Sequence, residues 1–166
     1  MPRLIKLQRG RMVLANDAFT HVDDEQGLPR GEVILSLARF QAEGDALLSE
    51  GRAVGVRLSP DDDIEALAYD LPRIAVVALA FPKFLDGRHY SNAQLLRGRY
   101  GFQREVRAVG DVLREQALFM VRSGFDAFEP ADGSTPEQWE RATERFRHVY
   151  QRAMDARAPA FVERQS

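Results

Sequence analysis

The sequence contains no cysteine. The chain therefore has no thiolate nucleophile, no disulfide and none of the usual ligands of an iron–sulfur cluster, so any redox chemistry needs a partner or a bound cofactor. It has three histidines, His21, His89 and His148, and no His, Asp or Glu set has the spacing of metal ligands, so we predict no metal site. We interpret His89 as a solvated loop residue, and the case for catalysis is weaker still for His21 and His148.

A strong excess of either charge is also missing. The 23 basic and 25 acidic residues give a formal net charge of -2 at pH 7, which would not steer the chain onto nucleic acid or an anionic membrane. No apolar run approaches the length that spans a membrane, and the first residues hold no apolar core of signal-peptide length. We therefore expect a cytoplasmic protein without a nucleic-acid or membrane partner, in which any basic site is local.

The length of 166 residues is typical of one domain. We divide it into an N-terminal hairpin and linker over residues 1–28, a βα core over residues 29–129 and a C-terminal helix over residues 134–157. No proline-rich or low-complexity segment splits the core, and we find no internal repeat. One domain, covering residues 1–166, is the expectation.

Strand-like and helix-like segments alternate through the core. We predict strands over residues 32–40, 53–58, 74–81, 105–109 and 125–128, and helices over residues 41–50, 59–71, 91–100 and 111–124. Alternation of this kind favours right-handed parallel crossovers. We predict an α/β protein with an open, mainly parallel sheet of about five strands and flanking helices, preceded by a short N-terminal β-hairpin. A half-barrel-like βα repeat is the alternative.

Arginines recur late in the predicted strands, between apolar neighbours, at Arg39, Arg57 and Arg107. In open α/β folds, ligands bind outside the carboxyl ends of the strands. Two or three arginines there, joined by Arg88 from the loop after residues 74–81, can bind an oxyanion through paired N–H groups. The helices that open at Ser91, with a capping-box pattern, and at Asp111 would add first-turn N–H donors at the same edge.

The same residues have a structural alternative. Buried arginine–carboxylate pairs are common scaffolding, so these arginines can instead brace loops by pairing with Asp86, Glu105, Asp126 or Glu129. Asp86 and Arg88 lie in an Asp-Gly-Arg segment. Either Asp86 is a general base and Arg88 binds an anion beside it, or the segment is an ordinary turn with a solvated arginine. Both alternatives stay open at this point.

A longer sequence motif runs through residues 81–129. It comprises Phe81-Pro82, Asp86-Gly87-Arg88, Tyr90-Ser91, Leu95-Leu96-Arg97, Tyr100-Gly101, Glu105, Arg107-Ala108-Val109-Gly110-Asp111-Val112-Leu113, Gln116 and Gly124-Phe125-Asp126-Ala127-Phe128-Glu129. Over about residues 29–129 the chain resembles a bacterial family described as domain of unknown function 934. One departure is Arg104, because the family usually has a glycine just before the glutamate that matches Glu105.

The resemblance implies an oxidoreductase involved in sulfite reduction, encoded near assimilatory sulfite reductase, and it brings no established catalytic residue. Sulfite and sulfate are small oxyanions, which Arg57, Arg88 and Arg107 suit. Our first hypothesis is a protein of assimilatory sulfite reduction that binds such an anion, or a sulfur-pathway intermediate, at the carboxyl ends of the strands.

Two other hypotheses belong to different classes of protein. One is a non-catalytic accessory partner of sulfite reductase. The other is an unrelated lyase or isomerase that uses Asp86 and Glu105 as acid and base. No GxGxxG or Walker loop is present, so we name no cofactor and do not expect the chain to transfer electrons alone.

Overall fold

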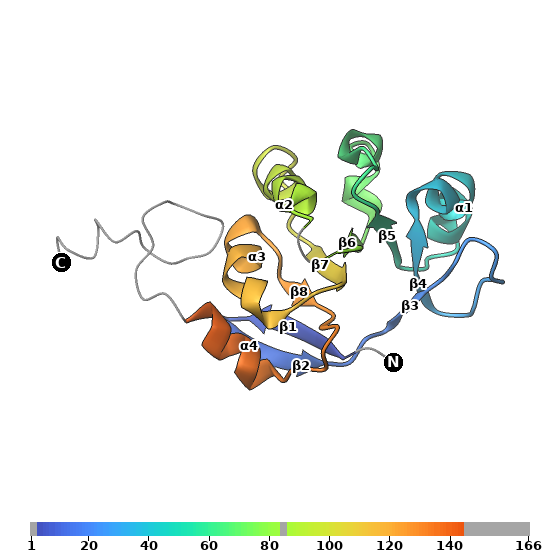
Figure 1. Ribbon diagram of the computed structural model, residues 1–166. Coiled ribbons are helices and arrows are strands. Elements are labelled where there is room, and N and C mark those ends of the chain that lie inside the picture. Colours follow the sequence, from blue (N-terminus) through green and yellow to red (C-terminus); the bar gives the residue numbers. More distant parts are fainter. Residues whose placement is uncertain (1–2, 84–85, 145–166) are drawn as a thin grey trace.

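Figure 1 shows the computed structural model, which describes residues 3–83 and 86–144. One sheet contains eight strands in the order β2-β1-β8-β7-β6-β5-β4-β3. Their bounds are β1 Leu4–Gln8, β2 Arg11–Ala15, β3 Phe19–His21, β4 Glu32–Ser36, β5 Val54–Leu58, β6 Val76–Phe81, β7 Glu105–Gly110 and β8 Ala127–Phe128. Strands β3 to β8 are parallel, and the β1–β2 hairpin joins β8 in antiparallel orientation through β1.

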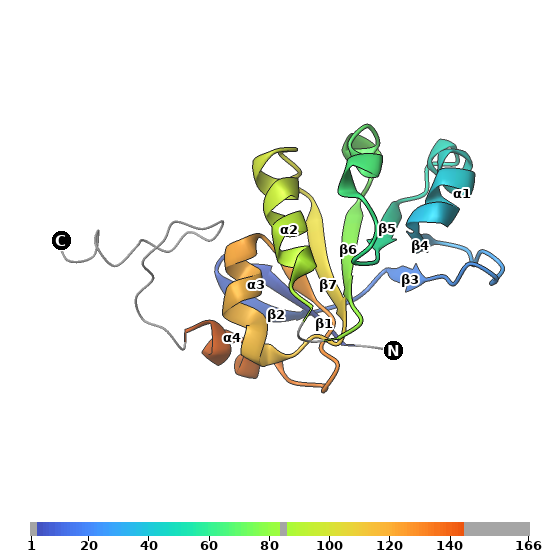
Figure 2. The same cartoon turned by 45° about the horizontal axis from the view of Figure 1, so that its top comes forward.

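The helices lie on the convex side of a curled sheet, as Figures 1 and 2 show. They are α1 Leu37–Ser49, α2 Arg88–Gly98, α3 Ala117–Ser123 and α4 Pro136–Thr143, with short 3₁₀ helices η1 Ile64–Leu67, η2 Leu71–Arg73 and η3 Arg114–Gln116. Each parallel strand pairs with the next in the chain, so successive right-handed crossovers return over the same face. The α/β prediction is confirmed, and the sheet has the curled, half-barrel form of our alternative.

The short connection between β2 and β3 requires this curl. These two strands are the opposite edges of the sheet, yet only residues 16–18 join them. Four Cα–Cα steps span at most about 15 Å, whereas eight flat strands would separate the edges by roughly 34 Å. The connection therefore crosses the concave side, and the two edges approach each other.

Most of the hydrophobic core lies between the sheet and the helices. The strands contribute fully buried side chains such as Val56, Leu79 and Val106, and α4 contributes Trp139, whose ring centroid lies 4.7 Å from that of Phe128. A second, smaller cluster contains Ile34, Val76, Ala78 and Val109, with Phe19 packed against it. Within the described residues, no helix has the length and apolarity to cross a membrane.

Several predicted boundaries were wrong. The strand predicted over residues 32–40 ends at Ser36, because the Ser36 side chain accepts the Arg39 N–H and starts α1. Arg39 is therefore a helical residue and not one at a strand end. The helix predicted over residues 59–71 is replaced by η1 and η2, with Asp63 and not Ser59 as the cap of η1.

Two predicted helix starts were also wrong. Helix α2 begins at Arg88, so Ser91 is an exposed residue inside the helix and not its cap. Asp111 does not cap α3, since η3 begins after Leu113 and leads into it. The linker predicted before residue 29 contains strand β3, which we missed.

The C-terminal helix starts as predicted. Thr135 and Gln138 form a capping box at the beginning of α4. The predicted helix over residues 134–157 continues beyond Thr143 into a part of the chain outside the described residues. The single-domain division stays a prediction, although the hairpin is an integral part of the sheet.

The tight junction after β7 gives a test of the fold. Gly110 has φ +91, and a Cβ there would lie 2.5 Å from the carbonyl oxygen of Phe81. That oxygen accepts the Asp111 N–H at 2.7 Å and cannot easily retreat. We expect Gly110→Ala to lower the free energy of unfolding by about 3 kcal/mol or more.

The matched control is Gly133→Ala, where φ is +68 and nothing lies within 4 Å of the added Cβ. Left-handed backbone alone costs about 1–2 kcal/mol, so this variant should lose only that amount in urea unfolding. Equal losses in the two variants would contradict the proposed clash with Phe81.

Candidate functional site

The register of the sheet brings Ser36 and Arg57, near the carboxyl ends of β4 and β5, onto one face with Arg107, which lies in the middle of β7 and not at its end as we expected. Ser36 pairs with Arg57, Arg57 with Ala78, and Ala78 with Arg107. Directly paired residues point to the same side of a sheet, so these side chains form one row on the concave side. Strand β6 lies between Arg57 and Arg107. Its residue in this row is Ala78, whose side chain is only a methyl group.

Arg107 is fully buried at the centre of an ion-pair network. Its guanidinium lies 2.8 Å from Asp17 Oδ2 and 3.1 Å from Asp17 Oδ1, which is a two-point contact. It also donates to Glu105 Oε1 at 2.6 Å and to Glu129 Oε1 at 2.8 Å. Lys6 extends the network, 2.8 Å from Glu105 Oε2. A buried guanidinium requires such partners, and here three elements of the chain supply them.

The pKa shifts in the network follow from these contacts. Burial alone would lower the pKa of Arg107, but hydrogen bonds to Asp17 and Glu129 and the charge of Glu105 raise it above its ordinary value. Burial would raise the pKa of Glu129, but hydrogen bonds and charges from His21 and Arg107 hold that pKa below its ordinary value. Arg107 and Glu129 are therefore charged at neutral pH.

Arg107 has little capacity left for an anion. Three carboxylates, Asp17, Glu105 and Glu129, face one guanidinium and the ammonium of Lys6. An oxyanion would have to displace a carboxylate from a buried site and would meet the negative charge of the others. The contacts that our structural alternative predicts for Arg107 are present.

Asp86 and Arg88 form a pair at the molecular surface. Arg88 Nη2 lies 2.7 Å from Asp86 Oδ2, and its Nη1 lies 2.7 Å from Asp61 Oδ1. Hydrogen bonds from the Arg88 side chain and backbone lower the pKa of Asp86 to about 2. A carboxylate with such a low pKa is a weak proton acceptor at neutral pH, so the case for Asp86 as a general base is weakened.

Arg57 differs from the other two candidate arginines. Its closest carboxylate is Asp23, with Arg57 Nη2 and Asp23 Oδ1 4.0 Å apart, which is too long for a hydrogen bond. The Asp23 side chain is 77% exposed, so water screens this pair. The Arg57 side chain itself is 28% exposed and lies beside the start of α1.

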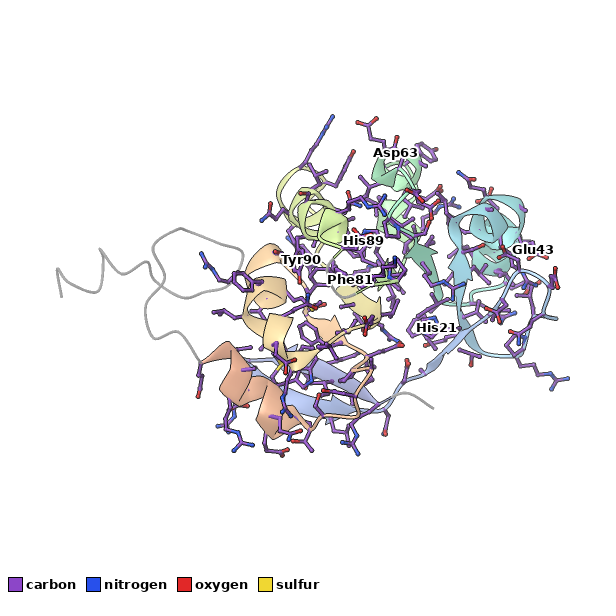
Figure 3. The ribbon with its side chains drawn as sticks, viewed as in Figure 1. His21, Glu43, Asp63, Phe81, His89 and Tyr90 are labelled. Carbon is purple, nitrogen blue, oxygen red and sulfur yellow. The ribbon has the colours of Figure 1, made fainter. Side chains whose placement is uncertain are left out.

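His89 is buried and not solvated, contrary to our interpretation of the sequence. Its exposed fraction is 1%, its Nε2 donates to the Leu58 carbonyl at 3.1 Å, and its Nδ1 accepts from Asn92 at 3.1 Å. Burial lowers the pKa of His89. The ring thus joins β5 to α2 and stacks edge-on against Phe81, beside Tyr90 (Figure 3).

The other predicted site residues are scattered. Glu105 belongs to the network of Arg107, on its amino-terminal side. Ser91 is exposed on α2, and Asp111 follows β7 with its N–H bound to Phe81. The structure therefore brings together Arg57, Arg107 and Glu105 on the concave side, and it leaves Arg88 and Ser91 on the outer surface.

No local sequence pattern points to Asp17 or His21 as site residues. Asp17 lies 90 residues from Arg107 in the chain, and His21 lies 108 residues from Glu129, with which it forms a hydrogen bond. Only the curl of the sheet brings these residues together. Among residues 3–83 and 86–144, no group of three or more His, Asp or Glu side chains is arranged to hold a metal ion.

A hollow of about 390 Å³ lies at the opposite, amino-terminal edge of the strands and includes Arg97, Gln103 and Asp126. Arg97 donates to the carbonyls of Gly124, Phe102 and Arg104 and pairs with Asp126 at 3.2 Å. Burial raises the pKa of Asp126, more than the charge of Arg97 lowers it. This arginine is saturated by the backbone, so the hollow lacks a cation for an anionic ligand.

The network at Arg107 gives a second test. Arg107→Met leaves three carboxylates without their cation, and we expect it to lower the free energy of unfolding by about 3–5 kcal/mol at pH 7. Glu129 has a lowered pKa in the folded protein, so its contribution is complete above its ordinary pKa and is lost as pH falls through the folded value. The deficit of Arg107→Met should therefore shrink on acidification.

Urea unfolding of both proteins at several pH values measures this deficit. The control is Arg99→Met, which removes an exposed arginine 3.7 Å from Glu65 and should lose far less stability. A deficit in Arg107→Met that does not change with pH would show that lost packing, and not unpaired carboxylates, causes it.

The comparisons with known proteins bear on the family. No curated protein sequence matches this chain. The model of the family described as "Bacterial protein of unknown function (DUF934)" matches residues 55–161. This match covers well over half of the chain and includes Arg57 and Arg107, and it confirms the family indicated by residues 81–129. The chain therefore belongs to the bacterial DUF934 family.

Proposed function

We propose that this protein acts in the cytoplasm in assimilatory sulfite reduction, and that it binds a small oxyanion at the carboxyl ends of its parallel strands. The sulfur pathway comes from the resemblance described above. The place of binding comes from the chemistry of the strand ends. Arg57 is the residue that we propose holds the anion.

A single observation carries this proposal. Of the three arginines considered as anion ligands, Arg88 and Arg107 each donate hydrogen bonds to carboxylates, whereas Arg57 has only Asp23 at 4.0 Å. A guanidinium without a hydrogen-bonded carboxylate keeps its paired donors free for a ligand oxyanion. Partial exposure lets the anion reach Arg57 from solvent, while the buried part of the side chain limits screening by water.

The start of α1 supports the same position. Ser36, which caps α1, pairs directly with Arg57 across β4 and β5. The N–H groups of the first turn of a helix carry partial positive charge. An anion beside Arg57 would therefore lie near a second source of positive potential.

The proposed role is binding or delivery of the anion, and not unaided electron transfer. The chain has no cysteine and no nucleotide-binding loop. Flavin or nicotinamide that remained bound through purification would contradict this part of the proposal.

A thermal-shift experiment tests the site at Arg57. The ligands are sulfite, sulfate and phosphate, with FMN, FAD and NADP in the same panel. An anion at ten times its dissociation constant adds about 1.4 kcal/mol of stability, which corresponds to a rise in Tm of roughly 3–6 °C for a chain of this size. We expect this rise in the wild type and its loss in Arg57→Ala.

The matched control is Arg73→Ala. Arg73 precedes β6 at the amino-terminal edge of the strands, so its removal changes the net charge equally but leaves the proposed site intact. Equal loss of the rise in both variants would show a general charge effect and would overturn the assignment to Arg57. No rise with any anion would overturn oxyanion binding and leave the two alternatives, an accessory partner of sulfite reductase and an unrelated lyase or isomerase.

A further inference from the structure

A histidine–glutamate pair lies on the concave side of the sheet, outside the residues considered so far as ligands. His21 ends β3, and Glu129 directly follows β8. These strands are separated by four others in the sheet, yet His21 Nε2 lies 2.8 Å from Glu129 Oε1. Figure 3 shows His21 on the inner side of the curl. The pair thus bridges the two sides of the concave surface.

The contacts of Glu129 determine which nitrogen of His21 carries a proton. Glu129 Oε1 also accepts from Arg107 Nη1 at 2.8 Å, and the pKa of Glu129 lies below its ordinary value. An ionised carboxylate only accepts hydrogen bonds, so Nε2 of His21 must be the donor. In the neutral ring, Nδ1 then holds the free electron pair.

This electron pair is available to a ligand. His21 Nδ1 makes no hydrogen bond within the described part of the chain and is not sealed from solvent there. The side chain as a whole is 25% exposed, compared with 8% for the side chain of Glu129. Glu129 is thus the buried orienting group, and His21 presents its second nitrogen outward.

The proposed anion site lies on the same face of the sheet as this nitrogen. Asp23, two residues after His21, is the carboxylate 4.0 Å from the Arg57 guanidinium, so Arg57 reaches toward the end of β3. His21 pairs with Ile34 of β4, and Ile34 pairs with Gly55 of β5, so His21 lies two strands from β5 and on the same concave face as Arg57. Arg57, His21 and Glu129 therefore share this face of the sheet.

We propose that His21 is a general base for a small oxyanion that carries a dissociable proton and is bound at Arg57. His21 Nδ1 takes the proton, and the electron pair of the broken bond stays on the anion. Glu129 is a positioning residue, which holds the ring and stabilises the imidazolium that forms. The proton then passes from Nδ1 to water. The substrate in this inference rests on the proposed function, whereas the orientation of the His21–Glu129 pair does not.

Acylation by diethyl pyrocarbonate tests the pair without any substrate, because the reagent modifies unprotonated imidazole nitrogens. Mass spectrometry of the full chain gives the rate at each histidine. We expect His21 to react at least about tenfold faster than His89, whose two nitrogens are both hydrogen-bonded and which is 1% exposed. Equal or slower reaction of His21 would overturn the proposal.

Glu129→Gln separates orientation from structural support. We expect the reaction of His21 to slow on the order of tenfold, as happens when a carboxylate behind a functional histidine is removed. Unfolding would expose His21 and speed its reaction, so slowing cannot come from loss of structure. An unchanged or faster reaction would overturn the role of Glu129.

A second measurement on the wild type guards against a variant that does not fold. The ring ¹⁵N shifts of neutral His21 should show a proton on Nε2 and none on Nδ1, and the reverse would overturn the proposal.

Sulfite should then protect His21 from acylation in the wild type and not in Arg57→Ala. Stabilisation by sulfite through Arg57 without protection of His21 would refute the shared site, while absence of any stabilisation would refute only the anion site.

Discussion

The contact between Arg107 and Asp17 is the interaction on which the shape of this protein depends. Asp17 lies in the three-residue connection that crosses from β2 to β3, the two edges of the sheet. The buried guanidinium of β7 binds it at two points, 2.8 and 3.1 Å, and so fixes the connection against the middle of the concave side. The short connection requires the curl, the contact with Arg107 holds it, and the curl brings His21 of β3 within 2.8 Å of Glu129 beyond β8.

The same network distinguishes the arginines by their contacts. Burial of the Arg107 guanidinium requires carboxylate partners, and the network supplies them. Arg107 is therefore a structural cation. Arg57 lies in the same row, one strand beyond Ala78, and receives no hydrogen-bonded carboxylate. Two residues with the same sequence context, an arginine between apolar neighbours in a strand, thus differ in their contacts because only one faces the crossing connection.

Sequence patterns predicted those features of the fold that depend on contacts between residues close together in the chain. The sequence predicts the start of the C-terminal helix near residue 134 and the end of another helix at Gly124, which has φ 116, because capping residues and a helix-ending glycine each act within a few residues. Residues 32–40 were assigned wholly to a strand, because a continuous apolar run does not show that Ser36 ends it. Strand β3 and the contacts of Asp17 and His21 were beyond sequence reasoning, since they depend on distant parts of the chain, whereas the pairing of Arg107 with Glu105 and Glu129 was among the alternatives.

The charges of the concave side determine where an anion can lie in the proposed site. With His21 neutral, the carboxylates of Asp17, Glu105 and Glu129 exceed Arg107 and Lys6 by one charge. At about 10 Å, roughly two strand spacings, this excess repels a unit anion by about 0.4–1.7 kcal/mol, whereas contact with Arg57 at about 4 Å attracts it by about 1–4 kcal/mol. The attraction by Arg57 therefore exceeds the repulsion by the network. Asp23, 4.0 Å from Arg57, opposes the attraction only weakly, because its side chain is 77% exposed and screened by water.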